Sequence, residues 1–156
     1  MKSHEYYMRA ALGRARTAAS KGEIPVGAVI VHKGRIIAGG RNNRENGKNA
    51  LYHAEISAID RACKRLGGWR LWECDMYVTL EPCPMCAGAI INSRIRNVYI
   101  GARDTKAGSF GSVVDFNDLP YNHKPVLHFG VCEAECAGIL KSFFKELRES
   151  KKSVNK

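Results

Sequence analysis

The segment from Met76 to Asn92 reads MYVTLEPCPMCAGAIIN and decides the fold. Its first five residues favour β-structure without interruption, which is typical of a buried strand. The sequence EPCP over 81–84 then breaks the strand. The compact apolar run over 85–92 predicts a helix with Pro84 in its first turn, where a backbone N–H is not needed. β-favouring residues return over 97–101, so this part of the chain forms strand, helix and strand.

The flanking segments supply the rest of the secondary structure. Apolar side chains recur at helical spacing from residue 3 to the stop at Gly22, and again from His53 to the stop at Gly67-Gly68. Two short β-favouring runs joined by residues 32–34, HKG, predict a hairpin. The expected elements are helices over 3–21, 53–66, 85–92 and 133–148, strands over 26–31, 35–38, 76–80, 97–101 and 126–131, and loops over 39–51 and 102–111.

The order of these elements indicates the fold class. A hairpin followed by alternating helices and strands predicts an α/β protein with a mixed sheet of about five strands and helices on both faces, a three-layer α/β/α arrangement. A chain of 156 residues with 45% hydrophobic composition can bury one sizeable core. We therefore expect a single domain over 1–149 and a basic, flexible tail over 150–156. Disorder and a two-domain enzyme are excluded.

Charge and hydropathy narrow the possible partners. The chain has 25 Lys and Arg against 15 Asp and Glu, a formal net charge of +10, and a pI of about 9.5. This excess favours polyanionic partners, nucleic acid in particular, although it could also serve only solubility. No apolar run approaches the roughly 20 residues that span a bilayer, and no secretory signal is visible at the start. We expect a cytoplasmic protein that does not cross a membrane.

Six cysteines are an even number, as in a disulfide framework. The chain is long and rich in core residues, however, and reduced thiols or metal ligands are the better interpretation. Cys132 and Cys136 are four residues apart near the start of the last helix, where packing is a simpler role than a second metal or redox site. The same interpretation applies to Cys63 and Cys74.

Chemically reactive residues concentrate in two short segments, each of which opens a predicted helix: His53-Ala54-Glu55 and the Cys83–Cys86 turn. A catalytic Zn²⁺ takes three imidazole or thiolate ligands and leaves a fourth position for water. His53, Cys83 and Cys86 supply that set, and the N–H groups at a helix start favour thiolate. Glu55 is close enough to His53 to shuttle a proton of the water without being a ligand itself.

His-x-Glu followed by Pro-Cys-x-x-Cys is a signature of zinc nucleobase deaminases. On this motif the chain resembles the cytidine deaminase-like superfamily, and most closely the bacterial tRNA-specific adenosine deaminases, which convert the wobble adenosine of an anticodon to inosine. The likeness covers nearly the whole chain. Beyond the zinc motif it includes residues 22–29, 77–88, 101–104, 121–123 and 143–148.

The resemblance implies a cytidine deaminase-like fold and one Zn²⁺ per subunit, bound by His53, Cys83 and Cys86. It implies hydrolytic deamination of adenosine, in which zinc-bound water attacks C6 and Glu55 moves the protons. It also implies a homodimer that takes the anticodon loop of tRNA as its substrate.

The resemblance further implies how the RNA is bound. Asn42 would hydrogen-bond the flipped base, and the backbone N–H of Ala54 would help to hold it. Extruding a base from a single-stranded loop costs less than extruding it from a duplex, and stacking on an aromatic side chain offsets part of that cost. Six further positions match residues that surround the anticodon loop, some of them reached across the dimer: Arg44, Asp104, Lys106, Asn122, His123 and Phe144.

One departure from the family lies directly before the zinc histidine. The family commonly has a Pro-Thr-Ala-like stretch there, whereas residues 49–52 of this chain read NALY. Tyr52 either points into the core or alters the mouth of the pocket. In the second case the tRNA substrate would be in question, while the deaminase chemistry would survive.

Several alternatives stay open at this stage. The enzyme could deaminate a free base or nucleoside such as guanine, cytosine or cytidine, or the protein could be a non-catalytic RNA-binding module with structural zinc. Substrate affinity that depends strongly on salt would separate RNA from a free base, because bound phosphates release counterions. Asn42 could be a turn residue, since asparagine tolerates turn geometry, and Phe144 could belong to the core face of the closing helix.

Overall fold

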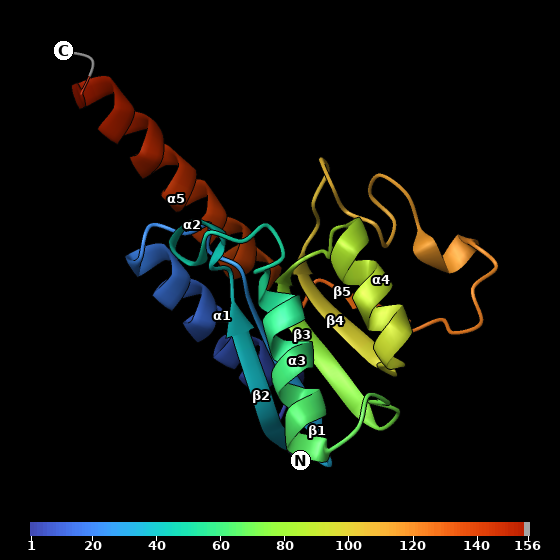
Figure 1. The fold of residues 1–156 in the computed structure, drawn as a ribbon. Coiled ribbons are helices and arrows are strands. Elements are labelled where there is room, and N and C mark those ends of the chain that lie inside the picture. The colour runs from blue at the N-terminus through green and yellow to red at the C-terminus, as the bar shows by residue number, and fades with distance from the viewer. Residues whose placement is uncertain (155–156) are drawn as a thin grey trace.

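Five strands form one sheet in the computed structural model, which describes residues 1–154 (Figure 1). The strands are β1 (Gly27–His32), β2 (Arg35–Arg41), β3 (Cys74–Leu80), β4 (Asn97–Ala102) and β5 (Val126–Phe129). Their order across the sheet is β2-β1-β3-β4-β5. β1 is antiparallel to β2 and β3, whereas β3, β4 and β5 are parallel to one another. The mixed sheet expected from the sequence is confirmed.

Helices cover both faces of this sheet. They are α1 (His4–Ser20), α2 (Arg44–Gly47), α3 (Ala54–Leu66), α4 (Pro84–Ser93) and α5 (Glu133–Val154), with a 3-10 turn, η1 (Phe116–Asp118). α1 and α5 lie on one face and α3 and α4 on the other, so the three-layer α/β/α prediction is confirmed (Figure 1). Among residues 1–154, no helix combines the length and apolarity needed to cross a membrane.

Two buried clusters hold the layers together, because successive residues of a strand face opposite sides of a sheet. Ile30 in β1 and Met76 in β3 pack with α3 and α4, whereas Val29 and Tyr77 pack with α1. Most residues of β1 and β3 are buried, whichever face they point to. This explains why both strands read as continuous apolar runs instead of alternating polar and apolar residues.

The parallel strands bring two functional segments to one end of the sheet. β3 and β4 are parallel, so residues 81–84 and 103–112, which follow them, emerge at the same edge. α4 begins there with Pro84 in its first turn. The start of α3 packs closely on β2 at Gly40. A Cβ at residue 40 would lie 2.2 Å from the carbonyl oxygen of Ala54, so this close approach requires glycine.

Some element boundaries differ from the predictions. α5 continues to Val154 instead of ending at Arg148, and Lys and Glu, which are good helix formers, fill much of that extension. Residues 150–154 of the expected tail are therefore exposed helix, and 155–156 lie outside the described residues. The loop expected over 39–51 contains the end of β2 and all of α2. Tertiary contacts stabilise such short elements, so the local sequence pattern does not predict where they form.

Candidate active site

His53, Cys83 and Cys86 bring three metal-binding atoms together. His53 and Cys83 are the N-cap residues of α3 and α4, and Cys86 lies in the first turn of α4. Nδ1 of His53 is 3.6 Å from Sγ of Cys83 and 3.5 Å from Sγ of Cys86. Nitrogen and sulfur ligands at their usual distances from a tetrahedral Zn²⁺ are about 3.6 Å apart. Among residues 1–154 these three form the one cluster of this kind, and they fit zinc as predicted.

Hydrogen bonding within the cluster separates the pKa values of its two thiols. The Cys86 thiol, assisted by His53, lowers the pKa of Cys83 to about 4, although burial opposes this effect. The same hydrogen bond, together with burial, raises the pKa of Cys86. The hydrogen bond with Cys83 also raises the pKa of His53. Metal binding would release the proton that remains on Cys86, since zinc takes thiolate ligands.

Glu55 lies in the first turn of α3 and is only 4% exposed. Burial raises the pKa of its carboxyl group to about 7, and the partial opposing effect of its own backbone N–H is smaller. Glu55 lines the same pocket as His53 and Cys83. A carboxyl group with a pKa near neutrality can both accept and donate a proton, which is what general acid–base catalysis requires.

These residues face a cavity of about 190 Å³. Its position at the ends of β3 and β4 follows the rule that ligands bind outside the carboxyl ends of parallel strands. Apolar side chains and a few polar groups share its lining, as is usual for small-molecule sites. The lining residues are Ile24, Val26, Asn42, Arg44, His53, Ala54, Glu55, Leu80, Glu81, Cys83, Asp104 and Ala107.

Four of the expected substrate-binding residues reach this cavity, namely Asn42, Arg44, Ala54 and Asp104. The Asn42 amide donates to the carbonyl oxygen of Ile24 at 3.3 Å and accepts from the backbone N–H of Arg44 at 3.4 Å. A primary amide has two donors and two lone pairs, so one of each remains for a ligand. Ala54 begins α3, where the first N–H groups have no intrahelical partner and the side chain of the N-cap residue, His53, does not cap them.

Lys106 and Phe144 do not line the cavity. Lys106 is exposed in the loop after β4, where its backbone N–H donates to the Asp104 carboxylate at 3.0 Å. Phe144 is 38% exposed on α5 and meets Phe143 edge-on. α5 projects from the body of the protein past α2, beyond the end of the sheet that holds the cavity (Figure 1).

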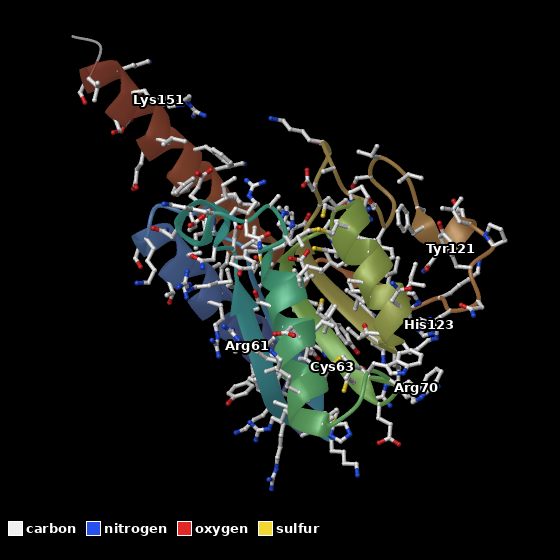
Figure 2. The ribbon with its side chains drawn as sticks, viewed as in Figure 1. Arg61, Cys63, Arg70, Tyr121, His123 and Lys151 are labelled. Atoms are coloured by element: carbon white, nitrogen blue, oxygen red, sulfur yellow. The ribbon has the colours of Figure 1, made fainter. Side chains whose placement is uncertain are left out.

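Asn122 and His123 lie far from the cavity within one chain. Nε2 of His123 is 2.8 Å from the carbonyl oxygen of Ile95, and its ring meets Trp72 edge-on. Ile95 and Trp72 precede β4 and β3, so both contacts are at the opposite end of the sheet. Figure 2 shows His123 beside the end of α4 that is remote from Cys83.

Tyr52 lies neither in the core nor among the residues that line the cavity. The side chain is 41% exposed, and its ring packs against Gly47 of α2, where an added Cβ would be 2.3 Å from Cδ2 of the ring. Together with Arg41 and Arg61 it lines a separate groove beside α3. The unusual residue before the zinc histidine therefore does not line the cavity; it contacts the neighbouring α2 segment through Gly47 and through Asn43, whose N–H donates to the Tyr52 carbonyl oxygen at 2.9 Å.

All six cysteines are free, which confirms the expectation of reduced thiols or metal ligands. Cys74 and Cys136 are fully buried, and burial raises their pKa values to about 11 and about 12. Burial raises the pKa values of the half-buried Cys63 and Cys132 as well. These are packing thiols, as expected.

Two buried glutamates near the cavity, Glu23 and Glu81, had no role in the sequence analysis. Glu81 lines the cavity, and Glu23 lies under α2. Both lie in segments that resemble the family, 22–29 and 77–88, but their hydrogen-bond partners are more than twenty residues away along the chain, so the local sequence does not show what they contact.

The fold, the zinc-binding donors and the buried glutamate together define a zinc-dependent deaminase. Residues 1–102 match the model of the cytidine and deoxycytidylate deaminase zinc-binding region. The chain is 47% identical over 157 aligned residues to the tRNA-specific adenosine deaminase of Bacillus subtilis, covering 100% of this chain and 98% of that protein. The chain belongs to the family of tRNA-specific adenosine deaminases.

Two solved deaminase structures resemble this chain. A tRNA:A34 deaminase that edits A to I at the wobble position of transfer RNA superposes with a TM-score of 0.84 and 46% identity, over 86% of this chain and 99% of that one. The guanine deaminase from Bacillus subtilis superposes with a TM-score of 0.63 and 32% identity, over 78% of this chain and 88% of that one.

Proposed function

We propose that this protein hydrolyses the amino group of adenosine at the wobble position of tRNA, which yields inosine and ammonia. The observation that carries the proposal is the 47% identity to a tRNA-specific adenosine deaminase, which extends over the full chain. Water balances the reaction: its oxygen bonds to C6 as the C6–N6 bond breaks. One of its protons ends on N1 of inosine and the other on ammonia.

Four side chains carry the chemical step. His53, Cys83 and Cys86 would hold Zn²⁺, which when bound acts as a Lewis acid with one open position and activates water. The Glu55 carboxylate accepts a proton from the attacking water and then delivers it to the purine. Because Glu55 is buried in the cavity, this transfer takes place away from bulk solvent.

The remaining lining residues bind and orient the base. Asn42 offers the unused donor and acceptor of its amide, and Ala54 offers a backbone N–H at the start of α3. Ile24, Val26 and Leu80 form an apolar surface that a flat base can cover. Holding the base against these groups supplies the orientation that makes attack at one carbon efficient.

Deamination of a free base is the second candidate, because the chain is also similar to a guanine deaminase. Three observations favour tRNA. The identity to the tRNA:A34 deaminase is 46% against 32%, and the TM-score is 0.84 against 0.63. The net charge of +10 also suits a polyanionic substrate, whereas a free base gains little from it.

The proposal includes a homodimer bound to the anticodon loop. Arg44 and Asp104 line the cavity, and the exposed Lys106 directly precedes the lining residue Ala107. These three residues are therefore placed to contact the nucleotides around the wobble base. Asn122 and His123 lie a strand length away, about 20 Å for the six residues of β4. They could approach the same RNA if a second copy presents them. A tRNA substrate also accords with a cytoplasmic location.

Two stem-loop RNAs test the proposal, one with its single loop adenosine at the wobble position and one with that adenosine moved to the neighbouring loop position. Zinc-loaded protein should form inosine in the first RNA and far less in the second. Chelated protein provides the control for metal dependence. Equal inosine formation in both RNAs, or none in either, would contradict the assignment.

A further inference from the structure

Two segments distant in sequence each contribute side chains to the cavity lining. The first, which we call the α2 wall, is residues 42–47 and contributes Asn42 and Arg44. The second, the loop wall, is residues 103–112 and contributes Asp104 and Ala107. Much of each wall is not part of a long helix or of the sheet, so its geometry has to be fixed by other contacts.

Glu23 fixes the α2 wall. Its carboxylate is fully buried and accepts from the backbone N–H of Glu45 at 3.0 Å and of Asn46 at 2.7 Å. The Asn46 side-chain amide also donates to it at 2.7 Å, and to the carbonyl oxygen of Lys21 at 2.9 Å. These donors lie in the single turn of α2, three and four residues after Asn42.

Glu81 fixes the loop wall in the same manner. Its carboxylate is 2% exposed and accepts from the backbone N–H groups of Asp104 at 3.1 Å, Phe110 at 3.2 Å and Ser112 at 3.1 Å, and from the Ser112 hydroxyl. The fit is close, since a Cβ at Gly108 would lie 2.4 Å from the Glu81 carboxylate. Both ends of the wall are thus tied to one side chain.

The donor count separates Glu81 from the other glutamate of the cavity. A carboxylate has about four lone-pair positions, and the four donors to Glu81 fill them. Glu55 is influenced by its own backbone N–H and the Cys86 thiol, and among residues 1–154 no N–H group of either wall donates to it. The acceptor positions of Glu81 are therefore all used by hydrogen bonds from the loop wall. In the part of the chain that the structure describes, Glu55 has no such bonds from a wall and is suited to proton transfer.

We propose that Glu23 and Glu81 are positioning residues for deamination: each buried carboxylate gathers the backbone N–H groups of one wall, and together they set the width and shape of the cavity around the base. The inference rests on the proposed function for its substrate. Burying two carboxylates is costly unless each is fully hydrogen-bonded. A need to hold the two walls rigidly explains why the carboxylates of Glu23 and Glu81 are buried despite this cost.

The test replaces each carboxylate in turn, as Glu23→Gln and Glu81→Gln. Glutamine keeps the size of the side chain but turns an NH₂ group toward the N–H donors. Hydrogen exchange should become at least about tenfold faster at residues 45 and 46 in the first variant, and at 104, 110 and 112 in the second. Each variant is the control for the other, because the wall that it does not touch should exchange as in the wild type.

The functional readout is kcat/KM for the wobble stem-loop with bound zinc measured in parallel. A misplacement of about 1 Å in a wall should lower kcat/KM by up to about 10²-fold while one zinc per chain is retained. Glu73→Gln makes the same charge change on an exposed side chain before β3. Ile30→Val lowers stability in the core without touching either wall. Neither control should lose more than about threefold in kcat/KM, since neither alters a wall.

Should a glutamine variant fail to fold, Asn46→Ala and Ser112→Ala each remove one donor and keep the carboxylate. They should show smaller changes confined to the same walls. Faster exchange confined to one wall, with lower kcat/KM and full zinc, supports the inference. Unchanged exchange or unchanged kcat/KM overturns it. If the wild-type protein forms no inosine, the proposed function fails, and the exchange rates alone then decide whether the carboxylates hold the walls.

Discussion

Replacing Glu55 with glutamine tests the chemical step most selectively. The side chain is 4% exposed in the first turn of α3 and lines the cavity with His53 and Cys83. Glutamine has nearly the same volume, so the cavity keeps its shape, and the three zinc-binding atoms are untouched. The amide cannot accept the proton of the attacking water. We therefore expect only proton transfer to be lost.

The expected fall in kcat follows from the loss of proton transfer alone. General acid–base assistance contributes about 10²–10⁴ in rate, which corresponds to about 2.7–5.4 kcal/mol in the activation free energy. Glu55→Gln should lower kcat for inosine formation by this factor. The dissociation constant for the stem-loop should change by less than about threefold, because Glu55 contributes little to ground-state binding.

Single-turnover inosine formation on a wobble stem-loop measures this prediction, with zinc content and the thermal midpoint recorded for the same preparations. An exposed variant with the same charge change, Glu73→Gln, is the control. A Glu55→Gln protein that keeps one zinc per chain and still turns over within about threefold of the wild type would refute the reasoning, since acid–base help is worth far more than that. Rate loss accompanied by loss of zinc would show that the residue acts through the metal site instead.

Other parts of the account give independent tests. Cys86→Ala removes one of three zinc ligands and should abolish stoichiometric zinc binding, as checked by metal analysis of the purified protein. Thr79→Val removes the hydroxyl that accepts from the backbone N–H of Gly27 at 3.2 Å and should lower the free energy of unfolding by about 1–3 kcal/mol in urea titrations, with zinc content unchanged. Although burial opposes them, hydrogen bonds from Asn46 and Glu45 lower the pKa of Glu23. Its stabilising effect is then complete above the ordinary glutamate pKa of about 4.3 and is lost as the pH falls through the lower folded-state value, so the unfolding free energy of the wild type should decline more steeply below about pH 4 than that of Glu23→Gln. Affinity for the stem-loop should fall with salt at a slope of about −0.7 per neutralised phosphate, and a flat dependence would contradict an RNA substrate.

The sequence predicted those parts of the protein that depend on local pattern. The apolar spacing of α1 and α3, the continuous runs of β1 and β3, and the break at 81–84 each report burial or turn formation within a few residues. The zinc ligands were predictable for the same reason, because two compact motifs carry them. Cys83 and Cys86 lie at the N-cap and in the first turn of α4, and His53 is the N-cap residue of α3.

Long-range contacts account for what the sequence did not reveal. Tyr52 was ambiguous because its position depends on the absence of a side chain at Gly47, in a helix too short to recognise. Glu81 meets its donors 23 to 31 residues later in the chain. His123 could be matched to a family position, but its distance from the cavity follows from strand direction. It precedes β5, which is parallel to β4, and the cavity lies at the carboxyl ends of β3 and β4. Such features depend on tertiary packing, which no periodicity reports.

The most direct measurement of the central claim compares substrates under identical conditions. Zinc-loaded protein is incubated separately with an anticodon stem-loop that carries a wobble adenosine and with free adenosine, cytidine, cytosine and guanine, while inosine and ammonia are quantified. We predict inosine in the stem-loop, an equal amount of ammonia, and negligible release from the free compounds. Deamination of guanine or another free compound, with an unreacted stem-loop, would contradict the assignment and would leave His53, Glu55, Cys83 and Cys86 as the centre of a different deaminase.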